Sequence, residues 1–215
     1  MDNHSFSQNE TSNPRLVIDR MEVAALLQAE LGLPESAIGD FERVIKAASD
    51  REGRTGHFAP PGAGMRAAHD TGAEHLNRIL VSYGWRCLQR KHLRFCMHPE
   101  KQVIILYQNV EEACNRAKSP INISSRGIET EELLTTPRNM TYPIFQPTVW
   151  FLCTSFKCGT LKAELSKPLP FQGMFSGFSL RLNVYNQDGP ELTTPDTPVD
   201  NSFEEELGDL ELSLR

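Results

Sequence analysis

Residues 85–108 read WRCLQRKHLRFCMHPEKQVIILYQ, and this stretch decides the expected fold. Its second half, VIILYQ from Val103, is the most apolar run in the chain and is typical of a buried strand. Its first half, residues 85–97, places most of its apolar residues at odd positions, which is typical of a strand with one buried face. The two halves, separated by the segment HPEKQ, predict a hairpin at the middle of a sheet.

A row of cationic side chains follows from the same pattern. If residues 85–97 form one strand, every second side chain points to the same face, about 7 Å from the next. The even positions then project together, and they include Arg86, Arg90, His92 and Arg94. Such a row is expected to meet phosphates or carboxylates, so these four residues form a predicted partner-binding site. The alternative interpretation is the solvated polar face of an antiparallel sheet.

Helices are expected before this stretch. Asp19 begins a capping box, and Gly32 suits the left-handed residue that ends a helix. Pro34 suits the first turn of a second helix, in which apolar residues recur at helical spacing. A third helix is predicted over residues 65–83 and places His69 on its apolar stripe, which indicates a histidine packed in the core.

Strands are expected again after a long excursion. Residues 149–156, 160–166 and 178–185 are predicted to be strands, and the last two place apolar side chains at every second position. Residues 111–117 suit a short helix. The sequence therefore predicts the α+β class, with N-terminal helices packed on a mainly antiparallel sheet of about five strands.

The expected domain organisation is a flexible arm (1–14), a single domain (15–187) and an acidic tail (188–215). Within the domain, residues 15–84 are expected to be helical and residues 85–187 to form the sheet. The tail carries nine acidic residues and one basic residue, a net charge of −8. The other 187 residues carry 19 acidic and 21 basic residues, a net charge of +2, so charge is segregated along the chain.

The tail also has apolar residues at helical spacing, and they are predicted to dock on a partner or on the domain. They are Phe203, Leu207, Leu210 and Leu214. The alternative is a solvated tail that aids solubility. The five cysteines have no repeating spacing and are expected to be free thiols, mostly buried. Without an apolar run of membrane-spanning length or a secretory signal, the chain is expected to be cytoplasmic, with no membrane partner.

Two kinds of chemical site are alternatives to simple binding. Cys96, His98, Cys153 and Cys158 are residue types that suit zinc, although their spacing is not that of a zinc knuckle. A metal-dependent nuclease would need an acidic residue and a Glu-x-Lys on adjacent strands. The nearest residues are Lys162 and Glu164, and their order does not match; Glu100 is the other acidic candidate.

Together these features predict a non-enzymatic intracellular binding protein that needs no cofactor. It would act through the basic strand face and the acidic tail, as an inhibitor or regulator of a nucleic-acid-handling complex. A protein partner is the first expectation, and nucleic acid bound at the basic face is the second. The alternatives are a nucleic-acid-processing enzyme, such as a metal-dependent nuclease, and a zinc-stabilised interaction module.

Overall fold

The computed structural model describes residues 15–56, 58–123, 130, 147–156, 159–171 and 174–188. In this part of the chain, three α-helices and one π-helical segment accompany a single seven-stranded sheet. The predicted α+β class is confirmed, but the sheet has seven strands instead of about five. The N-terminal arm and the tail beyond residue 188 lie outside the described residues.

The strand order of the sheet is β1-β7-β6-β5-β4-β3-β2. Four neighbouring pairs are antiparallel, while β4 with β5 and β1 with β7 are parallel, so the sheet is mixed. The strands are β1 (Leu16–Val17), β2 (Arg86–Arg90), β3 (Leu93–Met97), β4 (Val103–Asn109), β5 (Thr148–Ser155), β6 (Lys162–Phe171) and β7 (Met174–Asn186).

The helical half begins with α1 (Arg20–Leu26), which continues into the π-helical segment η1 (Leu27–Leu31). The predicted cap is present: the carboxylate of Asp19 accepts the N–H of Glu22 at 2.9 Å. Gly32 ends the segment with a φ of 69°, as predicted. The second helix, α2 (Ala37–Gly53), begins three residues after Pro34, not at it, and α3 spans Ala63–Ser82.

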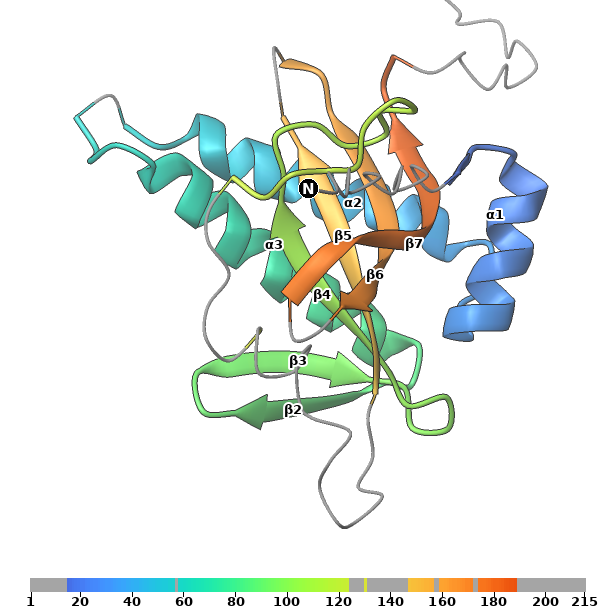
Figure 1. Ribbon diagram of the computed structural model, residues 1–215. Coiled ribbons are helices and arrows are strands. Elements are labelled where there is room, and N and C mark those ends of the chain that lie inside the picture. The colour runs from blue at the N-terminus through green and yellow to red at the C-terminus, as the bar shows by residue number, and fades with distance from the viewer. Residues whose placement is uncertain are drawn as a thin grey trace, which may run out of the picture.

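Helices α2 and α3 pack on one face of the sheet (Figure 1). The main core lies between these layers and joins Phe41 and Leu80 to Ile105 and Trp150. Helix α3 approaches β4 closely where it carries Gly72, since a Cβ at that position would lie 2.3 Å from Cζ of Tyr107. Glycine is therefore the residue that allows this spacing between helix and sheet.

The opposite face of the sheet has its own apolar cluster, to which Phe95, Ile104, Phe151 and Phe178 belong. The segment after β4 packs on it through Val110, Ala113 and Cys114. This segment contains no helix, so the prediction of a short helix over residues 111–117 was wrong. No helix in the described part of the chain is both long and apolar enough to span a bilayer.

His69 corrects another prediction. Its side chain is 46% exposed, so it is not a buried core histidine. The imidazole instead lies at the margin of the core, edge-on to the ring of Tyr107 with the centroids 5.7 Å apart.

Candidate functional site

The cationic stretch forms a two-stranded hairpin in place of the single strand predicted over residues 85–97. Strand β2 (Arg86–Arg90) turns at Lys91 and His92 and returns as β3 (Leu93–Met97). Lys91 adopts a φ of 51°, a backbone conformation that residues other than glycine, asparagine and aspartate rarely take. We call residues 86–97 the basic hairpin.

The turn divides the predicted cationic row between two faces. Residues paired directly across antiparallel strands point to the same face. Arg86 and Arg90 point to the same face of β2, because their positions in the strand differ by an even number. Arg94 is paired with Gln89, which points to the other face of β2. Arg94 therefore lies on the opposite face from Arg86 and Arg90. His92, which was predicted in the same row, lies in the turn.

The basic hairpin is attached to the sheet at its base. Only Cys96 and Met97 of β3 pair with β4, at Ile105 and Ile104. In Figure 1 the hairpin runs across the neighbouring strands at the bottom of the view and does not lie alongside them. Every residue of β2 is exposed, including Leu88 at 39%. The hairpin is thus a ribbon that is accessible along most of its length.

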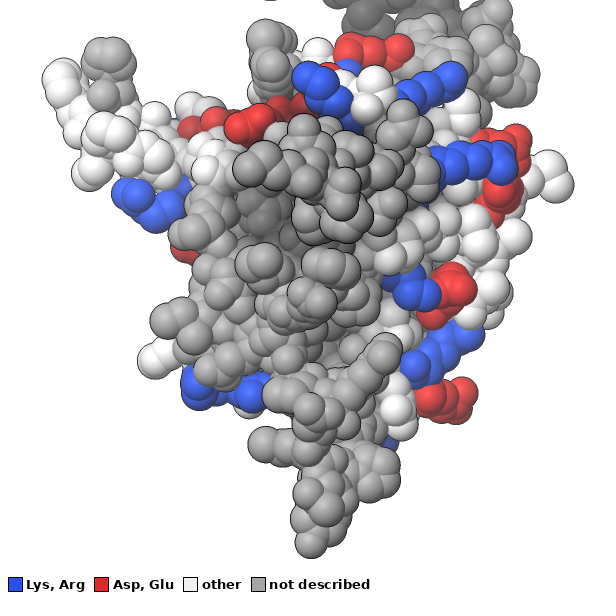
Figure 2. Space-filling view, in the orientation of Figure 1, with Lys and Arg blue, Asp and Glu red and all other residues white. Residues whose placement is uncertain are grey.

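Charge on this ribbon has one sign. Between residues 84 and 99 there is no aspartate or glutamate, while the lysines and arginines are Arg86, Arg90, Lys91 and Arg94. Figure 2 shows Lys and Arg atoms where the turn of the hairpin lies in Figure 1, with no Asp or Glu atoms beside them in that view. Both faces and the turn carry cations, so an anionic partner can be contacted from more than one side.

Strand β2 is also an edge of the sheet. Arg90 and Leu93 flank a two-residue turn. They must be a hydrogen-bonded pair, because a non-hydrogen-bonded pair at this position would need the next ladder hydrogen bonds to join the two turn residues, which are adjacent in the chain. Hydrogen-bonded and non-hydrogen-bonded pairs alternate along the ladder, so Cys87 and Gln89 direct their backbone N–H and C=O groups away from β3. In the described part of the chain, no strand pairs with this outer edge.

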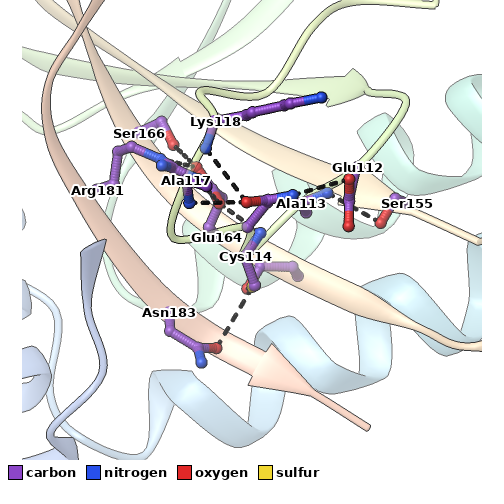
Figure 3. A network of polar contacts seen from close by, with 12 residues as sticks. Glu112, Ala113, Cys114, Ala117, Lys118, Ser155, Glu164, Ser166, Arg181 and Asn183 are labelled. Atoms are coloured by element: carbon purple, nitrogen blue, oxygen red, sulfur yellow. Dashed lines mark hydrogen bonds and ion pairs between the residues drawn. The ribbon is translucent and has the colours of Figure 1, made fainter. Parts of the chain in front are cut away.

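A second group of polar residues is buried between β6, β7 and the segment after β4 (Figure 3). Glu164 and Arg181 are both fully buried and form a bidentate ion pair, with Nε–Oε1 and Nη2–Oε2 distances of 2.7 Å. The Oγ of Ser166 donates to Oε1 of the same carboxylate, and the backbone N–H of Cys114 donates to Oε2, both at 2.6 Å. We call these four residues the buried ion-pair network.

The network positions Cys114 but does not activate it. The backbone of Cys114 is in the left-handed region, with a φ of 61°. Burial raises the pKa of the Cys114 thiol, and the neighbouring Glu164 carboxylate raises it further. The group is therefore a thiol at neutral pH, and it donates to the carbonyl oxygen of Ala163 at 3.3 Å. A thiol held protonated in this way is a poor nucleophile, so the network is structural in character.

The same geometry bears on the nuclease alternative. Both carboxylate oxygens of Glu164 are occupied by donors, so this residue has little capacity left to bind a metal ion. Lys162 points to a different partner and forms an ion pair with Asp188 at 3.0 Å. Glu100 lies in the exposed turn between β3 and β4, where its N–H donates to Nδ1 of His98.

Cys96 and Cys153, two of the cysteines that suit zinc, lie on opposite faces of the sheet. Cys96 belongs to the core on the helix-covered face, and Cys153 belongs to the cluster on the opposite face. His98 accepts backbone N–H groups and packs edge-on against Trp85, with ring centroids 5.4 Å apart. Within the described ranges, no three histidine, cysteine, aspartate or glutamate side chains are grouped as metal ligands. Cys158 lies outside those ranges.

The tail residues predicted to dock, Phe203, Leu207, Leu210 and Leu214, also lie outside the described residues. Their role stays a prediction.

The pattern of odd and even positions missed two features of the basic hairpin. Lys91 was not in the predicted row, because the turn that brings it beside the arginines was not recognised. The opposition of Cys87 and Cys96 across the ladder was missed for the same reason. The signal that could have located the turn is weak, since Lys-His lacks the glycine or asparagine that marks most two-residue hairpins.

Comparison with known proteins adds no functional assignment to this geometry: no protein-family model, no curated protein and no solved structure matches the chain.

Proposed function

We propose that this protein is a non-enzymatic binding protein that contacts nucleic acid through the basic hairpin, and that it thereby regulates a nucleic-acid-handling complex. The observation that supports this most directly is the projecting ribbon with cations on both faces and no acidic residue. An acidic patch on a protein surface would engage one face of such a ribbon. A nucleic acid groove offers phosphates on two sides, and the major groove has the width of a two-stranded ribbon.

The electrostatic contribution can be bounded from the hairpin itself. Each phosphate neutralised on a duplex contributes about −0.9 to the slope of log K against log salt concentration. Four lysine and arginine contacts therefore give a slope of about −3.6, which weakens binding roughly 150-fold between about 50 and about 200 mM salt. Binding of this kind is largely independent of sequence, because phosphates carry no base identity.

The test is fluorescence anisotropy with a labelled duplex and a labelled single strand over a salt series. A variant with Arg86, Arg90 and Arg94 replaced by glutamine should have a shallower dependence of log K on log salt concentration, with a slope of about −0.9 on the duplex. The matched control replaces the exposed Arg51, Arg54 and Arg66, which lie at the facing ends of α2 and α3, by glutamine. Equal binding by the wild type and the hairpin variant, or an equal loss in the control, would contradict the proposal.

A second candidate follows from the open edge of β2. A partner protein could add a strand there, with the backbone groups of Cys87 and Gln89 as donors and acceptors. Gln89→Pro removes one outward N–H without removing a hydrogen bond between β2 and β3. It should abolish strand addition while nucleic acid binding persists. Binding of a protein partner that is unchanged in Gln89→Pro would exclude this candidate.

The acidic tail is a proposed competitor for the same hairpin, on the ground of its charge. Removal of residues 189–215 should then tighten nucleic acid binding at low salt, in the same anisotropy assay. An unchanged affinity would separate the tail from the hairpin.

A further inference from the structure

Two cysteines face each other near the base of the basic hairpin. Cys87 of β2 is paired directly with Cys96 of β3. Counting back from the hydrogen-bonded pair at the turn, this pair is of the non-hydrogen-bonded type, in which the Cα atoms lie about 4.5 Å apart and the side chains are closest. A disulfide requires Cα atoms about 4.4–6.8 Å apart, and a non-hydrogen-bonded pair of ordinary geometry meets this requirement.

The two thiols have different surroundings. Cys87 is exposed, whereas Cys96 is fully buried, and its Sγ lies 3.4 Å from the backbone oxygen of Asn77, to which it donates. Burial raises the pKa of Cys96 to about 12, and the neighbouring thiol of Cys87 contributes to the rise. A dissolved oxidant therefore reaches Cys87 first, and Cys96 lies behind it.

We propose that Cys87 and Cys96 form a reversible dithiol–disulfide pair whose oxidant is a low-molecular-weight disulfide such as oxidised glutathione. This pair is a modification site within the basic hairpin. It differs from the other described cysteines, Cys114 and Cys153, because neither is paired across the ladder with another cysteine.

The exchange proceeds in two balanced steps. The thiolate of Cys87 attacks one sulfur of the oxidant, whose S–S bond breaks, and one glutathione leaves with the proton that Cys87 has lost. Cys96 then loses its proton and attacks Sγ of Cys87, and the mixed disulfide breaks to release the second glutathione with that proton. The raised pKa of Cys96 makes this second step slow, but Cys96 lies directly across the ladder from Cys87, so the attack is intramolecular and a small fraction of thiolate is enough. Two protein thiols are oxidised to one disulfide, and one molecule of oxidised glutathione is reduced to two thiols.

The consequence concerns how β2 is held. Every residue of β2 is exposed, and within the described part of the chain its one strand partner is β3. A covalent bond between Cys87 and Cys96 would prevent the separation of β2 from the rest of the sheet. Regulation of nucleic acid contact by this bond rests on the proposed function, whereas formation of the bond does not.

The experiment treats the full-length protein with oxidised glutathione, blocks free thiols by alkylation and maps tryptic peptides without reduction. Trypsin releases Cys87 in peptide 87–90 and Cys96 in peptide 95–101. We expect these two peptides to be linked, with the mass lower than the sum of the thiol forms by two hydrogen atoms. Dithiothreitol should reverse the linkage. Because the readout is mass, it is independent of nucleic acid binding.

Variants identify the order of events. Cys96→Ser should stop at a stable glutathione adduct on Cys87, and Cys87→Ser should leave Cys96 as a thiol. The wild-type map alone decides the proposal if a variant fails to fold. An unlinked pair in the oxidised wild type, with glutathione retained on Cys87 or with both cysteines alkylated, would overturn it.

Discussion

Loss of the Glu164 carboxylate should destabilise the protein more than loss of any surface charge. Glu164 and Arg181 are fully buried, and their two N–H···O contacts are 2.7 Å long. Glu164→Leu would leave the arginine charge without a counterion in the interior and would orphan two further donors, the hydroxyl of Ser166 and the N–H of Cys114. Removal of one partner of a buried pair typically costs about 3–5 kcal/mol of unfolding free energy.

Removal of both charges should cost much less than the two single changes together. Arg181→Met alone would leave the Glu164 carboxylate buried with two neutral donors, again at about 3–5 kcal/mol. The double variant Glu164→Leu/Arg181→Met has no unpaired charge, so it retains mainly the cost of the orphaned donors, about 1–3 kcal/mol each. The two single changes together should cost roughly 8 kcal/mol and the double variant roughly 4 kcal/mol, so the coupling free energy between the two positions should be about 4 kcal/mol.

Urea unfolding, followed by the fluorescence of the buried Trp85 and Trp150, measures each free energy of unfolding. The control is Glu74→Gln, which breaks the exposed ion pair of Glu74 with Arg78 on α3 and should change stability by less than about 0.5 kcal/mol. A cost below about 1 kcal/mol for either buried single variant, or additive effects in the double variant, would refute the reasoning.

Three further predictions concern the helical layer and the core. Gly72→Ala should destabilise by about 1–3 kcal/mol in urea unfolding, because its Cβ would overlap the ring of Tyr107, whereas Gly39→Ala on α2 has open space and should be neutral or stabilising. Asp19→Ala should cost about 1 kcal/mol through loss of the α1 cap, and a Ser at this position should restore most of it. Stability should also fall at alkaline pH, because burial raises the pKa of Cys96 in the folded protein to about 12. The contribution of the protonated Cys96 thiol to the free energy of unfolding is complete below the pKa of this thiol in the unfolded chain, and it is lost as the pH rises toward the pKa in the folded protein. Thermal unfolding above about pH 8.5 measures this loss, which should be smaller in Cys96→Ala, and an equal loss in that variant would assign the effect elsewhere.

Local signals in the sequence were reliable where the structure depends on neighbouring residues. The carboxylate of Asp19 caps α1, and Gly32 takes the left-handed conformation that ends the helical segment. Both effects involve backbone groups within one or two helical turns. The apolar run of β4 likewise identifies a strand that is buried on both faces. These features required no knowledge of the rest of the chain.

The buried ion-pair network shows where such signals end. Alternation along β6 places Ala163 and Leu165 on one face and Glu164 on the other, and the second face was expected to be polar. The residue is instead fully buried, because β7 brings Arg181 opposite Ser166 and the segment after β4 covers the pair. A charge can be buried only with a partner, and that partner is set by strand register.

The sequence by itself determined the class of the fold, the caps of its first helix, the central buried strand and the segregation of charge. Tertiary structure decided the rest. It paired the two-residue strand β1 with β7, and it reversed the chain at Lys91 and His92, which turned a predicted one-sided row into a ribbon with cations on both faces. The physical reason is that side-chain direction alternates with a period of two along a strand, so one unrecognised turn reassigns every side chain that follows it.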